Sequence, residues 1–327
     1  MLAAGCGGSD SGAQSAPPAA STARLSPTVV PDPLGTFIHT DAQSLNVLRL
    51  GEDRLTPIVK YTDYTTIGFP SVSPDGKSVA FAEQLQNNKA VKGLGTDIYV
   101  VGIDGKNLRQ VAAHAKENEF LQSPQWVSTH EIIFDVRGPL NETQAYYRID
   151  KLDVSTGARS TLIDNALRPS VSPDLKSLAY SVIDPSTGID RLMLSTPELA
   201  PPTPLTPDDK RIALITYAVF SPDGSRLAFA AQDVQKSAGA APSGGGRLHA
   251  QVSHPGAQDI WTVNRDGSGL RKIADLADAN PSIAFGNDID TVFVLGTTGF
   301  WKISLSAGTM QKLTARVPFG EIARVPQ

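Results

Sequence analysis

Side chains with catalytic potential are few and scattered in this 327-residue chain. Among its five histidines, His249 and His254 lie close together in a stretch rich in Gly and Ser. Two histidines without a cysteine or carboxylate pattern fall short of the ligand set that zinc requires. There is no GxSxG motif for a nucleophilic serine, and no GxxxxGK[ST] or GxGxxG motif for a phosphate. The sequence therefore predicts no catalytic centre, no metal site and no cofactor.

The only cysteine, Cys6, follows Leu2-Ala-Ala-Gly and precedes a stretch, residues 7–33, that is rich in Gly, Ser, Ala and Pro. This arrangement resembles a bacterial lipobox followed by a flexible tether. A cysteine modified in this way carries a diacyl group, and two or more acyl chains give stable anchoring to a membrane. The apolar part of an export signal does not precede Cys6, so we expect residues 1–35 to be a truncated signal region and tether.

The lipobox interpretation predicts a lipid-anchored protein of the cell envelope. Gly7 rather than Asp follows the cysteine, which favours the outer membrane or its periplasmic face in a host with two membranes. In other hosts we expect the extracellular face of the membrane. The alternative is a free cysteine in a disordered tail, and it stays open.

The charge balance argues against nucleic acid as a partner. The net charge is -4, the isoelectric point is about 5.7, and the basic residues are scattered among acidic ones. A phosphate backbone is bound by clustered Lys and Arg, and no such cluster is present. No apolar run is long enough to cross a bilayer.

One hairpin motif occurs in three near-copies. Their shared serines lie 99 residues (73 to 172) and 49 residues (172 to 221) apart, and a degenerate copy at 124–134 lies between the first two. A period near 50 residues is typical of propeller blades of four strands. The turn residues of the three copies are Ser73, Pro74, Asp75, Gly76, Ser172, Pro173, Asp174, Ser221, Pro222, Asp223 and Gly224.

The chemistry of this motif predicts a tight turn between two strands. Pro presets φ, Ser and Asp bond nearby backbone amides, and Gly accepts a positive φ. The residues after the turn alternate between polar and apolar, as in a half-buried strand. Leu175 replaces the Gly in the second copy, so we expect that turn to be strained or differently shaped.

A second hairpin follows the first in two of the repeats. Its Asp-Gly turns, Asp104-Gly105 and Asp266-Gly267, are strong hairpin signals. Together the Ser-Pro-Asp-Gly turn and the later Asp-Ile-aromatic hairpin resemble the TolB-type propeller repeat. The resemblance implies an all-β fold, but without the additional N-terminal α/β domain of TolB.

Complete repeat units start near Gly68, Leu121, Leu167, Tyr217 and Asn280. Ahead of them, three short apolar runs within 35–59 lack a first strand, which residues 321–325 can supply. We therefore predict that residues 36–327 form a six-bladed β-propeller of four-stranded antiparallel blades, closed by the N- and C-terminal strands. Closure of this kind removes exposed sheet edges.

The second turn of each blade and the links between blades are long and varied, whereas the other turns are short and repetitive. Loops on a rigid scaffold commonly carry recognition. We therefore expect a monomeric, non-enzymatic scaffold that binds an envelope protein. A propeller that binds a small ligand or carbohydrate, or acts as an enzyme in its central channel, is the alternative. The candidate residues for the binding face are His114, Lys116, Arg137, Asp208, Lys210, Arg211, His249 and His254.

Overall fold

The computed structural model describes residues 34–51, 54–62, 65–84, 93–142, 144–184, 190–207, 212–233, 257–313 and 317–326. These residues form β-strands joined by turns, and none of them lies in a helix that could span a membrane. Cys6, Asp208, Lys210, Arg211, His249 and His254 lie outside the described residues.

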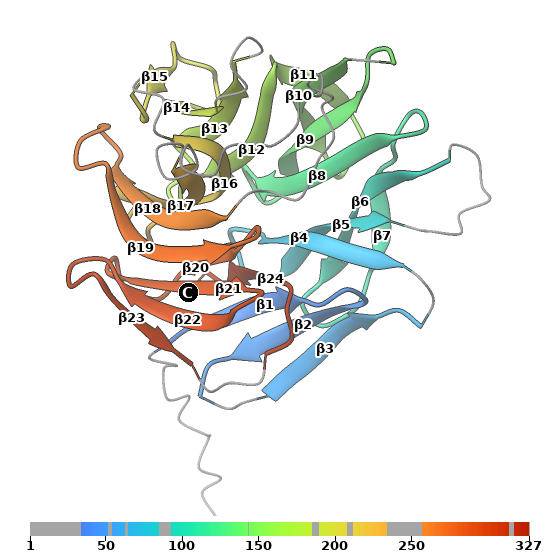
Figure 1. Ribbon diagram of the computed structural model, residues 1–327. Helices are drawn as coiled ribbons and strands as arrows, with labels where there is room; N and C mark the ends of the chain where they lie inside the picture. The colour runs from blue at the N-terminus through green and yellow to red at the C-terminus, as the bar shows by residue number, and fades with distance from the viewer. Residues whose placement is uncertain are drawn as a thin grey trace, which may run out of the picture. The chain divides into compact units, whose positions relative to one another are not determined.

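The strands form antiparallel sets of four that follow one another along the chain (Figure 1). The first two consecutive sets are β4 (Thr66–Val72), β5 (Ser78–Gln84), β6 (Gly95–Gly102) and β7 (Arg109–Ala112), then β8 (Glu119–Trp126), β9 (Glu131–Pro139), β10 (Ala145–Asp153) and β11 (Arg159–Asp164). Parallel pairing of β6 with β8 joins these two sets into one sheet of eight strands.

Three further sets follow, each of them a separate sheet of four strands. They are β12 (Ala166–Val171), β13 (Leu178–Ile183), β14 (Asp190–Ser195) and β15 (Thr203–Pro204), then β16 (Ile212–Phe220), β17 (Arg226–Asp233), β18 (Gln258–Asn264) and β19 (Arg271–Asp278), and finally β20 (Ser282–Phe285), β21 (Thr291–Gly296), β22 (Gly299–Ser304) and β23 (Thr309–Lys312).

The remaining sheet combines the two ends of the described chain. It contains β1 (Thr36–Thr40), β2 (Ser44–Arg49) and β3 (Arg54–Lys60), and the last strand, β24 (Glu321–Arg324), pairs antiparallel with β1. This is the pairing that the sequence predicted for the C-terminal segment. β24 occupies the same position in its set as β4, β8, β12, β16 and β20 in theirs.

These first strands contact one another in order. β4 contacts β8, β8 contacts β12, β12 contacts β16, β16 contacts β20, β20 contacts β24, and β24 contacts β4. We call these six strands the inner strands.

The core lies between neighbouring sets, and both faces of a set are buried. In β5, Val79 and Phe81 pack into a cluster with Ile38 of β1, whereas Ala80 and Ala82 pack into the next cluster. Fully buried aromatic rings recur on the second strands at Phe81, Phe134, Phe229 and Phe293. Each such ring contributes roughly 1.5–3 kcal/mol through burial, so the interfaces between sets supply most of the hydrophobic stabilisation.

The Ser-Pro-Asp turns join inner strands to second strands, as predicted. Ser73 donates its hydroxyl to Asp75 at 2.6 Å, and the Ser78 amide donates to the Ser73 hydroxyl at 2.9 Å. The copies at Ser172 and Ser221 have the same bonds. The Asp-Gly turns likewise form the predicted hairpins β6–β7 and β18–β19.

Leu175 takes the left-handed conformation that Gly occupies in the other two turns. Its φ is 60°, compared with 69° at Gly76 and 71° at Gly224. The three turns therefore have the same backbone conformation although Leu replaces Gly in one of them. The strain predicted for this turn lies in the left-handed conformation of Leu175.

Placing Leu at position 224 and Gly at position 175 should change the free energy of unfolding in opposite directions. We expect Gly224→Leu to lower the free energy of unfolding by about 1–2 kcal/mol, because an L-residue is strained in the left-handed region. Leu175→Gly should raise it by up to about 1 kcal/mol, since relief of strain is partly offset by the entropy of Gly. Urea unfolding of both variants measures this, and equal losses in the two would contradict the turn geometry.

Candidate functional site

A cavity of about 920 Å³ lies among the inner strands and is the candidate functional site. Its lining comes from β4, β8, β12, β16, β20 and β24, together with residues of the second strands such as Arg137 and Gln232. A volume of this size is in the range of small-molecule pockets.

One residue of each inner strand from β4 to β16 projects from a bulge. The pairing register shifts between Gly68 and Ser71, between Gln122 and Gln125, between Leu167 and Ser170, and between Thr216 and Val219. Left-handed residues occupy these bulges, and Asn280 stands in the same conformation just before β20. The five residues, which all line the cavity, are Phe69 (φ 55°), Ser123 (52°), Arg168 (54°), Tyr217 (49°) and Asn280 (58°).

This conformation is unfavourable for these residues, and a following proline adds to the cost. Phe69, Ser123, Arg168 and Asn280 each precede a proline. Residues before proline prefer extended backbone, and a left-handed non-glycine residue costs roughly 1–3 kcal/mol. Strain of this kind concentrates at functional sites, so the bulges mark the cavity wall as the place to look for a function.

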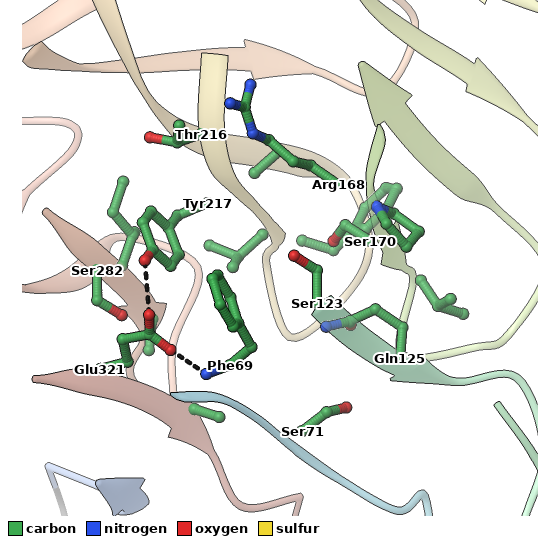
Figure 2. A pocket seen from close by; sticks show the side chains of 18 of the residues that line it. Phe69, Ser71, Ser123, Gln125, Arg168, Ser170, Thr216, Tyr217, Ser282 and Glu321 are labelled. Atoms are coloured by element: carbon green, nitrogen blue, oxygen red, sulfur yellow. Dashed lines mark hydrogen bonds between the residues drawn. The ribbon is translucent and has the colours of Figure 1, made fainter. Parts of the chain in front are cut away.

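Glu321 of β24 connects the opposite sides of the cavity wall. Its carboxylate accepts a hydrogen bond from the Tyr217 hydroxyl at 2.8 Å and another from the Phe69 amide (Figure 2). Asn280 in turn donates to the Tyr217 oxygen at 3.2 Å. Burial raises the pKa of Glu321 above its usual value, although the two donated bonds act in the opposite direction. Burial also raises the pKa of Tyr217 well above its usual value.

Two arginines approach the cavity from β9 and β12. Arg168 donates through Nη1 to Asp190 at 2.9 Å and to the carbonyl of Ile215 at 2.5 Å. Arg137 donates through Nη2 to the side-chain oxygen of Gln122. Burial raises the pKa of Asp190, while the charge of Arg168 opposes this shift.

Asp135 lies behind these arginines and is completely buried. Its oxygens accept no well-formed hydrogen bond among the described residues, and its closest ion-pair contact is Arg137 Nε at 3.9 Å. Burial raises the pKa of this carboxyl, against the opposing effects of Arg137, Ser123 and Arg168.

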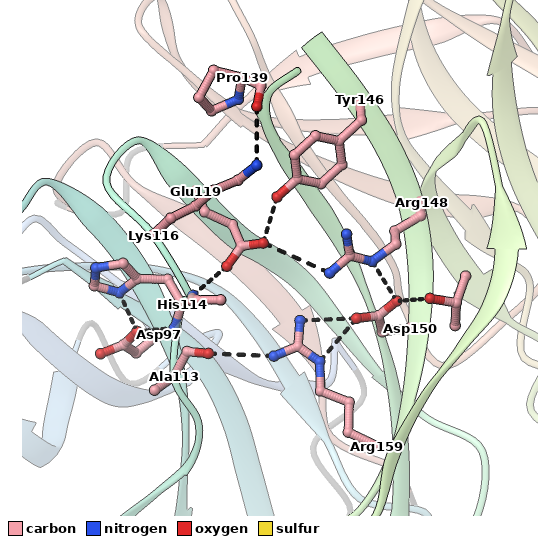
Figure 3. A network of polar contacts seen from close by, with 12 residues as sticks. Asp97, Ala113, His114, Lys116, Glu119, Pro139, Tyr146, Arg148, Asp150 and Arg159 are labelled. Atoms are coloured by element: carbon pink, nitrogen blue, oxygen red, sulfur yellow. Dashed lines mark hydrogen bonds and ion pairs between the residues drawn. The ribbon is translucent and has the colours of Figure 1, made fainter. Parts of the chain in front are cut away.

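The sequence-predicted residues His114 and Lys116 belong to a different cluster, in the link between β7 and β8 (Figure 3). His114 is buried, and its Nδ1 lies 2.6 Å from Asp97 Oδ1. This placement differs from the expectation that His114 lies on an open face. Lys116 donates to the carbonyl of Pro139 at 3.1 Å and stands 4.6 Å from the centre of the Tyr146 ring.

The same link is fixed by a network of charges. Glu119 accepts hydrogen bonds from the Ala115 amide and the Tyr146 hydroxyl. Asp150 forms ion pairs with Arg148 and Arg159, each at 2.8 Å. Since acids and bases are matched here, the network is best understood as a structural support for the link.

Of the sequence-predicted face residues within the described chain, only Arg137 lines the cavity. The turn aspartates Asp75, Asp174 and Asp223 stay in their turns, bonded to Ser73, Ser172 and Ser221. Among the described residues, no group of three or more His, Cys, Asp or Glu side chains is placed to hold a metal ion.

Sequence reasoning missed Phe69, Arg168, Tyr217, Asp135 and Glu321. One signal was available for the first three, because each stands four residues before the shared serine of its motif (69 and 73, 168 and 172, 217 and 221). This position varies while the turn that follows it is nearly constant. A variable position inside a repeated motif indicates a side chain that the repeat itself does not specify.

Comparison with solved structures identifies the fold. TolB from Acinetobacter baumannii superposes with a TM-score of 0.64 at 13% identity, over 90% of this chain and 67% of that one. The fold is that of a TolB-like β-propeller. A chain of a nidogen–laminin complex is similar, with a TM-score of 0.61 at 11% identity, over 89% of this chain and 98% of that one.

A third similar structure is the hydrazine synthase of Kuenenia stuttgartiensis. Its TM-score is 0.63 at 14% identity, over 90% of this chain, which spans only 47% of the synthase chain. No protein-family model and no curated protein sequence matches the chain. At these identities the comparisons establish the propeller fold alone.

The raised pKa of Glu321 predicts a stability that depends on pH. A carboxyl whose pKa is higher in the folded state stabilises the fold most below its usual value of 4.5, and this contribution is lost as pH rises through the raised pKa. Glu321→Gln keeps an acceptor and a donor but does not ionise. Its free energy of unfolding, relative to that of the unmodified protein, should therefore rise as pH increases from about 4 to 8.

Urea unfolding across this pH range measures the effect. The matched control is Glu131→Gln, which alters a partly exposed carboxylate paired with Lys151 at 2.7 Å and should not reproduce the trend. A difference between Glu321→Gln and the unmodified protein that stays constant with pH would show that Glu321 does not carry a raised pKa.

Proposed function

We propose that this protein is a non-enzymatic scaffold of the bacterial cell envelope, anchored by a lipid on Cys6, that binds another envelope protein. The observation that carries the proposal is the position of its exposed apolar side chains. Among the described residues, the three most exposed large apolar side chains are Leu140 (64%), Phe319 (55%) and Leu94 (44%). All three lie in second turns or links between sets.

The second turns and the links between sets differ in sequence from one another, whereas the first and third turns repeat. Leu94 ends the β5–β6 connection, Leu140 follows β9, and Phe319 precedes β24. These connections do not repeat in sequence. The first and third turns, which carry the Ser-Pro-Asp and Asp-Gly motifs, do repeat and are occupied by their own hydrogen bonds. Loops on a rigid scaffold commonly carry recognition, and an apolar side chain exposed on such a loop supplies contact area for a protein partner.

The ring that presents these loops is proposed to have six blades. Six sets of four strands are described, and their inner strands contact one another in cyclic order, with the pairing of β24 and β1 as the clasp. Residues 36–327 would then form one domain, with residues 1–35 as its tether. A closed ring holds its loops in fixed relative positions, which is what a rigid recognition surface needs.

The class of partner is supported by the similar structures. TolB has this fold, and another similar chain comes from a nidogen–laminin complex, which is a complex between proteins. We infer a protein partner in the same compartment as the lipid anchor, and a monomeric scaffold.

Photo-crosslinking in cells tests the protein-binding face. A photoreactive amino acid at Leu94, Leu140 or Phe319 should give an adduct with one recurring envelope protein, identified by mass spectrometry. Leu108 and Leu199 are matched controls, because they are similarly exposed (41% each) but lie in third turns. The same adducts from the control positions, or none from Leu140 and Phe319 in folded protein, would contradict the proposal.

The lipid anchor predicts a change in location. When the gene supplies a complete export signal, Cys6→Ser should move the protein from the membrane fraction to the soluble fraction, because the acyl chains are lost. Fractionation of cells and metabolic labelling with a fatty acid measure this. Ser9→Ala, in the same Gly- and Ser-rich stretch, is the control. Membrane retention of the Cys6→Ser protein without a label would rule the anchor out.

A further inference from the structure

We propose that the cavity among the inner strands binds a small organic carboxylate, held by Arg137 and Arg168. This inference goes beyond a protein-binding face and does not depend on it, since it concerns the interior of the molecule. The cavity wall described above carries both guanidinium groups together with the Ser123 hydroxyl.

The two arginines form a single corner of the cavity. Arg137 donates to Gln122, the residue before Ser123, and β12, which carries Arg168, contacts both β8 and β9. Figure 2 shows Arg168 and Ser123 on the wall of the cavity, with the Phe69 ring projecting toward its middle. A pair of guanidinium groups beside a hydroxyl is a common arrangement for binding a carboxylate or phosphate.

These arginines keep donors that the protein does not use. Among the described residues, Arg137 donates through Nη2 only, and its side chain is 26% exposed. Within the same residues, Arg168 donates through Nη1 only. A guanidinium has five N–H donors, so each of the two arginines keeps donors that a ligand oxygen in the cavity could accept from.

Asp135 lies beside Arg137 without forming a hydrogen bond to its guanidinium. The carboxyl lies opposite Gln122 in the pairing of β8 with β9, and its contact with Arg137 Nε is long, at 3.9 Å. It is not itself part of the cavity lining. Asp135 therefore lies on the side of the guanidinium groups that faces away from the cavity. The side that faces the cavity stays available for a ligand.

The pair of Asp135 and Arg137 does not recur at the equivalent positions of the other sets. The residues that pair at the place of Asp135 in other sets are Ala82, Ser181 and Ala230. The residues two positions further along, at the place of Arg137, are Gln84, Ile183 and Gln232. A buried acid and an arginine where other blades have small or neutral residues indicate a local requirement that the blade itself does not impose.

The apolar and aromatic residues of the cavity wall favour an organic anion over an inorganic one. The rings of Phe69 and Tyr217 are nearly parallel, with centroids 6.4 Å apart and an interplanar angle of 14°, and both line the cavity. Pro70, Leu167 and Leu214 add further apolar surface. A ligand with a carboxylate at one end and an apolar or ring-shaped body would match this wall better than an inorganic ion.

The remaining charges of the cavity lining do not oppose an anion. The Glu321 carboxylate already accepts bonds from Tyr217 and Phe69. Arg324 also lines the cavity, forms no ion pair among the described residues, and has a pKa lowered by burial alone. The lining therefore has three arginines and one occupied carboxyl, while two further carboxyls outside the lining, Asp135 and Asp190, lie against Arg137 and Arg168.

Calorimetric titration at low ionic strength tests the site with three probes: succinate, phthalate and inorganic phosphate. We expect saturable 1:1 binding of at least one organic acid. Arg137→Met should weaken that binding by about tenfold or more, as expected for the loss of a charge-assisted bond. The matched control Arg265→Met removes an arginine that pairs with Asp174 outside the cavity, and it should bind as the unmodified protein does.

A second variant keeps the test decisive if Arg137→Met does not fold. Asp135→Asn removes the negative charge behind the arginines and should tighten binding several-fold, which a purely structural role would not produce. Failure of both acids to saturate, equal binding by Arg137→Met, or equal loss in Arg265→Met would overturn the proposal. Binding of phosphate alone would overturn the organic carboxylate in favour of an inorganic anion. None of these outcomes bears on adducts formed at Leu140 or Phe319.

Discussion

The pairing of β24 with β1 is the interaction on which the rest of the structure depends. Without it, β1 would present an unpaired edge, and the inner strands β20 and β4 would lack the neighbour that lies between them. The same strand brings Glu321 and Arg324 into the cavity wall. β24 therefore both pairs the two ends of the described chain and completes the cavity wall, so a change in β24 affects the stability of the fold and the chemistry of the site together.

Much of the fold could be predicted from the sequence, because turn chemistry is local. Ser73, Asp75 and Gly76 satisfy one another within a few residues, so their pattern specifies a turn regardless of the surroundings. The strand assignment around Asp104-Gly105 follows from the same logic. Even Leu175, which breaks the pattern, has the backbone conformation that the pattern requires.

The site could not be predicted in the same way, because its contacts are distant in sequence. Glu321 bonds to Phe69, 252 residues away in the sequence, and to Tyr217, 104 residues away. No local sequence pattern predicts either bond. His114 shows the opposite error: the sequence predicted that this polar residue of a long link lies on an open face, but it is buried and bonded to Asp97 of β6. The charge of a residue and the length of its loop do not show whether the residue is exposed to bind a partner or buried to hold the loop in place.

The bulges of the inner strands have a consequence for which side chains line the cavity. Each bulge places one side chain on the cavity wall, and two of these side chains, Phe69 and Tyr217, also pack against the core clusters between sets. Phe, Ser, Arg and Tyr occupy the bulge in one molecule, each in the same left-handed conformation. The side chain at the bulge can therefore differ from strand to strand, while the backbone of the strand and the turn that follows it stay the same.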